Sequence, residues 1–182
     1  MPRPTREQID EEILDVAATL FARHGFKETS LQRIADAVGY SKTGLLHRFP
    51  TKEALQEAVL QRCVEEIRAE TASALEHPPG PARDRAAILA FAEFALRHPG
   101  FVALILGIFS SLETVESDGP VGGIAAAVLE AFAVGADSDF PRRLRVAGAL
   151  GALCVARLAF PDHTSGEVRG HLVALSADAL GH

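Results

Sequence analysis

The 182-residue sequence contains no tryptophan, one tyrosine and only two cysteines. Cys63 and Cys154 are far apart in sequence and lie in helical surroundings rich in Ala and Leu, which favours two reduced thiols of a cytoplasmic protein over a disulfide. The longest apolar runs, at residues 101–109 and 146–156, fall short of the roughly 20 residues that a membrane-spanning helix needs. The N-terminus is polar and lacks an apolar signal core. We therefore expect a soluble, cytoplasmic protein.

Catalytic and cofactor-binding motifs are also lacking. The sequence has no glycine-rich phosphate loop, no HExxH motif, no nucleophile elbow and no Cys/His cluster at metal-ligand spacing. The seven histidines are scattered, and none stands at a recognisable spacing from an acidic partner. These absences predict that the chain is not an enzyme and needs neither a cofactor nor a metal ion.

Alanine and leucine are abundant, whereas β-branched and aromatic residues are sparse, and this composition favours helices over strands. Apolar spacing predicts about nine helices, at residues 5–25, 31–38, 42–49, 52–75, 83–97, 101–112, 124–134, 141–159 and 165–180. Breaks rich in Pro and Gly separate several of them, notably HPPGP at 77–81 and ESDGPVGG at 116–123. The sequence therefore predicts an all-α fold.

Residues 29–52 contain two short helical patterns joined by a tight turn. Ser30 and Ser41 stand at the N-cap positions of the two helices, and Gly39 follows the first where a left-handed residue turns the chain. The inward-facing positions are apolar at helical spacing: Leu31, Ile34, Ala35, Val38, Leu45 and Phe49. This pattern favours a helix-turn-helix, whose second helix can lie in a DNA major groove. An ordinary helical hairpin is the alternative.

The charge distribution agrees with DNA binding at this segment. The whole chain carries a formal charge of −6. Residues 23–52 contain six basic and two acidic side chains, a net +4, so the remainder carries −10. Positive charge concentrated on one segment is what contact with phosphates requires, and the acidic remainder discourages a second nucleic-acid face.

The first third of the chain resembles the N-terminal domain of the TetR family of bacterial transcriptional regulators. The resemblance rests on Phe21, Gly25-Phe26, Thr29-Ser30, Ile34-Ala35, Val38-Gly39, Ser41-Lys42 and Phe49-Pro50-Thr51-Lys52-Glu53-Ala54-Leu55. It implies a DNA-binding domain at residues 1–66 and a helical ligand-binding and dimerisation domain at 67–182. It further implies a homodimeric repressor that a small apolar effector releases from a palindromic operator. The alternative is a helical protein–protein interaction module that does not bind DNA.

The resemblance also supplies candidate DNA contacts. These are Ser30, Gln32, Ser41, Lys42, Thr43, Gly44, His47, Arg48 and Lys52. Lys42 can donate to guanine and the Thr43 methyl can meet a thymine, while Gly44 allows close approach of the backbone. Leu46 stands where the family usually has a tyrosine that meets a phosphate, so we expect Arg48 to supply a replacement contact.

For the C-terminal part, we expect an apolar ligand pocket and a dimer interface. The candidate ligand-binding residues are Phe91, Phe94, Phe101, Phe109, Ser110, Glu113 and Arg157. Helices 141–159 and 165–180 are expected to form the homodimer, because small residues about one turn apart allow close approach of a partner helix: Ala147, Gly148, Gly151, Ala152 and Ala156. The apolar area is expected from Leu144, Leu150, Leu153, Val155, Leu172, Val173 and Leu175.

Overall fold

The computed structural model describes residues 5–110, 120–163 and 166–181, and within them it contains nine α-helices and no β-strand. The helices are α1 (Arg6–Glu28), α2 (Leu31–Ala37), α3 (Lys42–Arg48), α4 (Lys52–Leu75), α5 (Pro81–Arg97), α6 (Pro99–Ser110), α7 (Pro120–Ala131), α8 (Phe140–Ala159) and α9 (Gly166–Leu180). The all-α prediction is confirmed, with helix bounds that shift by a few residues. The largest shift is at α7, which begins at Pro120 inside the predicted loop because proline is well suited to the first helical position.

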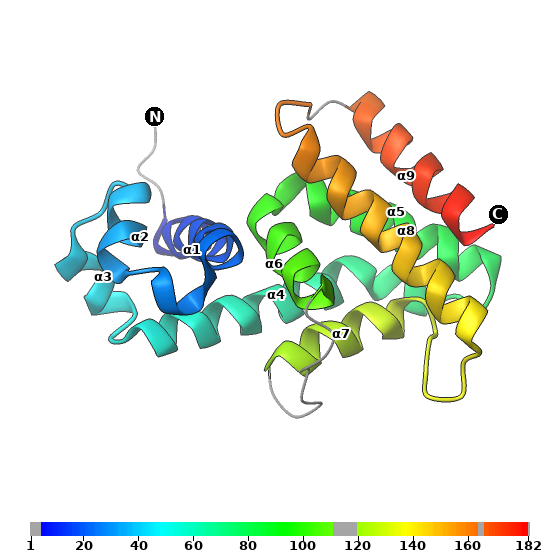
Figure 1. Cartoon of the computed structure of the whole chain (residues 1–182), viewed down its shortest axis with the longest axis horizontal. Coiled ribbons are helices and arrows are strands. Elements are labelled where there is room, and N and C mark those ends of the chain that lie inside the picture. Colours follow the sequence, from blue (N-terminus) through cyan, green and yellow to red (C-terminus); the bar gives the residue numbers. More distant parts are fainter. Residues whose placement is uncertain (1–4, 111–119, 164–165, 182) are drawn as a thin grey trace.

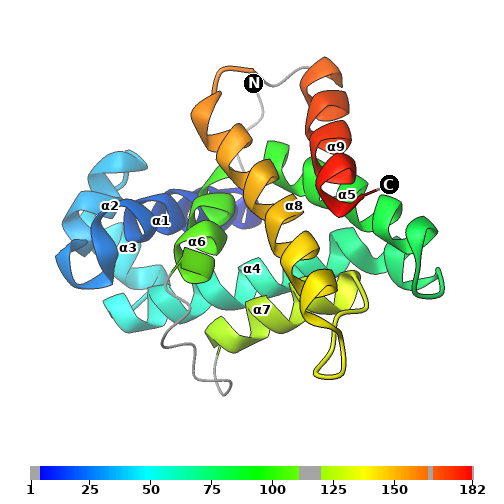
Figure 2. The same cartoon turned by 45° about the vertical axis from the view of Figure 1, so that its right-hand side comes forward.

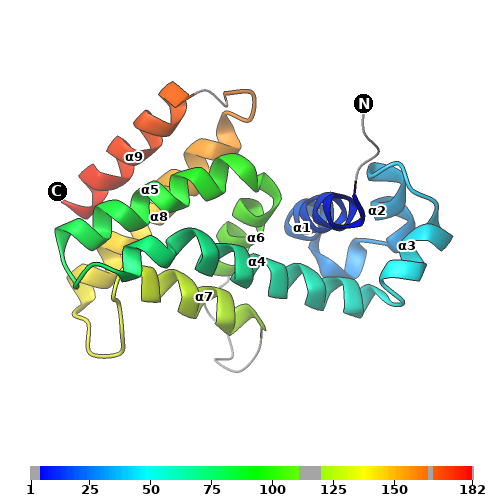
Figure 3. The same ribbon diagram turned by 180° about the vertical axis from the view of Figure 1, so that it is seen from behind.

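The first three helices lie at one end of the molecule, and α5 to α9 form a bundle at the other (Figure 1). Helices α1, α2 and α3 pack together at the first end, and α4 runs from there along the bundle. Seen from behind, α4 passes in front of α6 and runs alongside α5 and α7 (Figure 3). We call α1–α3 with the start of α4 the N-terminal unit.

Polar side chains at helix starts fix the N-terminal unit locally. Thr5 and Gln8 form a capping box at the start of α1. Gly25 lies inside α1 with φ of 77° and interrupts its regular geometry, near the predicted end of the first helix. The buried Thr29 hydroxyl then donates to the carbonyls of Leu20 at 3.2 Å and Gly25 at 2.9 Å, which secures the turn into α2.

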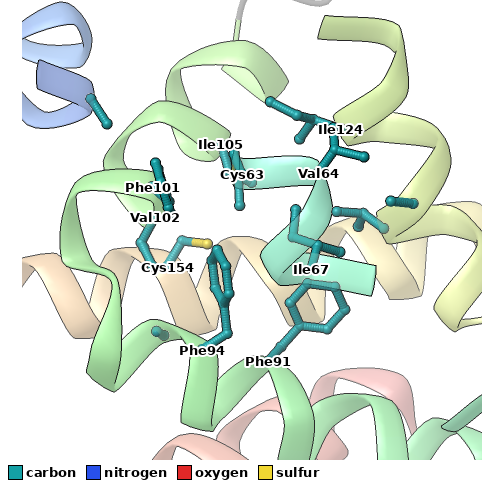
Figure 4. Close-up of a cluster of buried hydrophobic side chains, with 14 of the residues drawn as sticks. Cys63, Val64, Ile67, Phe91, Phe94, Phe101, Val102, Ile105, Ile124 and Cys154 are labelled. Atoms are coloured by element: carbon teal, nitrogen blue, oxygen red, sulfur yellow. The ribbon is translucent and has the colours of Figure 1, made fainter. Parts of the chain in front are cut away.

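Figure 4 shows part of the core of the bundle, to which α4, α5, α6, α7 and α8 all contribute buried side chains. The Phe91 and Phe132 rings are stacked with centroids 5.7 Å apart, and the Phe94 and Phe101 rings lie 6.3 Å apart. Aromatic pairs at these separations stabilise a core beyond the area they bury. These rings therefore fix how α5, α6 and α7 pack.

Both cysteines are buried in this region and remain free thiols. Burial raises the pKa of the Cys154 thiol to about 12 and raises that of Cys63 further above its ordinary value. Both thiols therefore stay protonated near neutral pH and are poor nucleophiles. We expect the native protein to resist alkylation at pH 8 and to take up two alkyl groups in denaturant, as mass spectrometry would show.

Charged side chains connect helix ends within the bundle. Asp84 in the first turn of α5 is almost fully buried and accepts two hydrogen bonds from Arg142 of α8, at 2.7 and 2.6 Å. Arg142 also donates to the carbonyl of Phe132 at 2.7 Å, and Arg83 donates to that of Ala131 at 3.0 Å. Two arginines thus satisfy carbonyl groups at the end of α7 that the helix itself leaves unpaired.

Within the described ranges, no single helix is both long and apolar enough to cross a membrane. Helices α5 and α6 meet the length and composition requirement only when they are taken together, and they are bent by 114° to one another.

Candidate nucleic-acid interface

The turn between α2 and α3 has the geometry that the sequence predicts. Gly39 adopts a φ of 70°, and the N–H of Tyr40 donates to the carbonyl of Ala35 at 2.8 Å. Each helix begins at the expected cap, since the Ser30 and Ser41 hydroxyls accept from backbone N–H groups at 3.1 and 3.0 Å. Ile34, Ala35 and Leu45 are fully buried against the rest of the N-terminal unit. Their burial fixes which face of α3 remains outside.

The outer face of α3 presents Lys42, Thr43 and His47 to solvent. These are three of the predicted base-reading residues, and the structure brings them together on the first two turns of one helix. Gly44 lies between them and is half-buried. A Cβ on Gly44 would lie 3.1 Å from the Ser41 hydroxyl oxygen, so glycine also keeps space for the helix cap. Glycine at position 44 therefore makes room for the Ser41 cap, in addition to the close backbone approach to DNA expected from the sequence.

Arg48, the expected replacement phosphate contact, pairs with a carboxylate instead of standing free. Its Nη1 forms an ion pair with Asp10 of α1, and the side chain is only 20% exposed. The same nitrogen is 3.4 Å from the Arg6 carbonyl oxygen. In this arrangement Arg48 connects the end of α3 to α1. Asp10 was not among the sequence candidates, because 38 residues separate it from Arg48 and no local pattern links them.

Lys52, another predicted phosphate contact, is bound to the end of α1. Its ammonium donates to the carbonyls of Phe26 at 2.9 Å and Lys27 at 3.2 Å. It also lies 4.4 Å from the centre of the Phe26 ring, within the range of a cation–π interaction. A positive charge at a helix C-terminus is favourable, so Lys52 stabilises the join between α1 and α4.

Two polar contacts flank the recognition helix at α2. Gln32, a predicted contact, donates from Nε2 to Asp36 Oδ1 at 2.7 Å. Arg33 is exposed, and its Nη2 lies 2.8 Å from His24 Nε2. The sequence candidates omitted Arg33 and His24, although both lie in the basic segment that the charge distribution indicated.

The predicted ligand-binding residues occupy different surroundings. Phe91, Phe94 and Phe101 are at most 4% exposed and belong to the packed core. Arg157 is also buried, where it donates to the carbonyls of Ala95 at 3.1 Å and Pro161 at 3.2 Å. The remaining candidates lie outside the description, namely Glu113 and the side chains of Phe109 and Ser110. The ligand site stays a prediction.

No group of three or more His, Cys, Asp or Glu side chains in the described part of the chain is arranged to hold a metal ion. One shallow pocket lies on the N-terminal unit, between α1 and α4, and is lined by Arg6, Glu7, Asp10, Glu11, Leu14 and Arg62. It opens on the side of α1 that carries the ion pairs to Arg48 and Arg62.

Comparison with known proteins gives consistent similarities. Residues 13–59 match the model for "Bacterial regulatory proteins, tetR family". The chain is 39% identical over 56 residues to the HTH-type transcriptional repressor KstR2 of Rhodococcus jostii, covering 31% of this chain and 28% of that protein. It is 47% identical over 53 residues to the HTH-type transcriptional regulator RutR of Escherichia coli, covering 29% and 25%. The matches thus span about a quarter of the length of these relatives.

Structural similarity extends over nearly the whole chain. A TetR family transcription regulator from Marinobacter aquaeolei superimposes with a TM-score of 0.60, covering 96% of each chain at 18% sequence identity. This level of identity supports a common fold and carries no information about ligand or operator. The N-terminal unit is therefore similar in sequence as well as in structure, and the C-terminal bundle is similar in structure.

Proposed function

We propose that this chain is a member of the tetR family of bacterial regulatory proteins and acts as a homodimeric DNA-binding transcriptional regulator that represses transcription from a palindromic operator. The observation that carries the proposal is the exposed row of Lys42, Thr43 and His47 on a capped recognition helix. An ammonium, a hydroxyl with a methyl group and an imidazole can read base edges in a major groove.

The uncovered face of α8 and α9 supports the dimer. Leu144 and Val155 of α8 are 58% and 53% exposed, and Leu175 of α9 is 44% exposed. Side chains added at Gly148 or Gly151 would meet nothing within 4 Å, so a partner helix could come close there. The expected interface differs in one respect from the sequence prediction, because Leu150, Leu153 and Leu172 are buried inside the bundle. The two helices lie side by side on one face of the molecule (Figure 2).

An apolar effector suits the character of the bundle, whose core side chains are nearly all hydrophobic. An effector placed between α5 and the end of α7 would have to separate aromatic rings that now touch, such as Phe91 and Phe132. Its binding would therefore change how these helices pack. A ligand that binds one packing better than the other shifts the protein toward that packing, which is the requirement for regulation.

We expect Lys42→Ala to weaken binding to an operator duplex by roughly 5- to 150-fold, equivalent to about 1–3 kcal/mol for one specific contact. The duplex would be selected from a random library with the parent protein, and affinity would be measured by fluorescence anisotropy. Arg68→Ala is the matched control, because Arg68 is an exposed cation on α4 beyond the N-terminal unit. Equal affinity of the Lys42→Ala and Arg68→Ala variants would contradict the assignment of α3 as the recognition helix.

A further inference from the structure

The first turn of α6 lies against the middle of α1, which belongs to the N-terminal unit. The Gly100 N–H donates to Asp15 Oδ1 at 3.1 Å, and the Thr19 hydroxyl donates to the Asp15 carbonyl at 3.1 Å. A Cβ on Gly100 would lie 2.1 Å from that carbonyl oxygen and 2.8 Å from the Thr19 hydroxyl oxygen. Only glycine allows the two helices to approach this closely, because real Cβ contacts below 3.0 Å essentially never occur.

Asp15 places a carboxyl group at the positive end of α6. Burial raises the pKa of Asp15, although backbone hydrogen bonds from Gly100 and Phe101 and the nearby His98 partly oppose the rise. A carboxyl whose folded pKa is raised costs stability as the pH increases from its ordinary value of 3.8 through the raised value. The ionised Asp15 carboxylate therefore lowers the stability of the fold at pH values above its raised pKa. The same negative charge strengthens the hydrogen bonds that Asp15 accepts from the start of α6.

The same helix is anchored in the C-terminal core. Phe101, Val102 and Ile105 of α6 are buried there, and α6 also packs against α8 (Figures 1 and 4). At the bend between α5 and α6, His98 Nε2 lies 3.6 Å from Glu66 Oε2 of α4. A change in the packing of the core would therefore move the start of α6, and with it the contact with α1.

The N-terminal unit is thus held in two ways. The chain continues through α4, and α6 contacts α1 at Asp15. A single connecting helix can still bend and twist, whereas a second contact away from its axis restrains both motions.

We propose that Asp15 and Gly100 are positioning residues for operator binding: their contact sets the orientation of the N-terminal unit relative to the bundle, and so the spacing of the two recognition helices. This inference rests on the proposed dimeric regulator. Because the two half-sites of an operator have a fixed separation, an altered orientation weakens binding to the full site and leaves the chemistry of each half-site contact intact.

The first test compares Gly100→Ala with Gly107→Ala in the same helix. A Cβ at Gly107 would meet nothing within 4 Å, so this control adds the same methyl group without a clash. With a palindromic duplex selected by the parent protein, we expect Gly100→Ala to bind about tenfold more weakly, within the usual range of allosteric coupling. Binding to a duplex that carries one half-site, measured at low salt, is expected to match the parent for both variants.

The second test compares Asp15→Asn with Glu12→Gln on α1. It still tests the contact between α1 and α6 if the Gly100→Ala variant does not fold. Glu12 is exposed, so its replacement removes the same charge without touching α6. Loss of a negative charge by itself favours binding to DNA. We expect Glu12→Gln to bind the palindrome as tightly as the parent or slightly more tightly, and Asp15→Asn to bind it several-fold more weakly.

Parent-like binding of the palindrome by Asp15→Asn and by folded Gly100→Ala would overturn the inference while leaving the proposed function in place. An equal loss on the half-site would also overturn it, because the damage would then lie within the reading surface. Failure of the parent protein to select any duplex would instead refute the proposed function itself.

Discussion

Replacing Asp84 with alanine is expected to destabilise the protein by about 3 kcal/mol, the lower end of the cost of removing one partner from a buried ion pair. The Asp84 side chain is 2% exposed and that of Arg142 is 28% exposed. Removal of the carboxylate leaves the guanidinium with only the carbonyl of Phe132 among its described partners. It also loosens the connection between α5 and α8. The melting temperature should fall by roughly 6–12 °C for a protein of this size.

The control for this prediction lies on the same helix. Glu93 of α5 pairs with Arg169 of α9, but both side chains are more than a third exposed. Exposed pairs contribute little, so we expect Glu93→Ala to change the melting temperature only slightly. A double replacement, Asp84→Leu with Arg142→Met, should restore much of the stability, since no charge would then be buried alone. Similar melting temperatures for Asp84→Ala and Glu93→Ala would refute the importance of the buried pair.

Gly148→Arg is expected to convert the proposed dimer to a monomer and to weaken operator binding by at least about 100-fold. A monomer engages one half-site, and its affinity should approach that of non-specific binding, about 10⁻⁴–10⁻⁶ M, instead of the 10⁻⁸–10⁻¹¹ M typical of specific complexes. Within one chain the new side chain has room, because a Cβ at Gly148 meets nothing within 4 Å. The fold should therefore survive. Light scattering and anisotropy with a selected operator would measure the two effects.

Two features make this result interpretable. The added arginine is positive, so electrostatics alone would strengthen DNA binding and cannot explain a loss. Gly148→Ala serves as the control for bulk, since it adds only a methyl group and raises helix propensity by about 1 kcal/mol. We expect this control to remain dimeric. A Gly148→Arg protein that stays dimeric would exclude this face of α8 from the interface.

Local features of the helices follow from the sequence alone. The predicted caps at Ser30 and Ser41 are confirmed, because a cap depends on residues only two or three positions apart. The turn at Gly39 is likewise confirmed, since its left-handed conformation is a property of one residue. These short-range features were sufficient to predict the helix-turn-helix and the all-α fold.

Contacts between distant helices were decided only by the tertiary structure. Arg48 and Lys52 were expected on DNA, yet both bind partners on α1 that are 25 or more residues away in sequence. The inner and outer faces of α8 were also indistinguishable in advance, because its apolar residues surround the helix: Leu150 and Leu153 are buried while Leu144 and Val155 are exposed. Helical spacing determines which residues share a face, but only packing against other helices determines which face is covered.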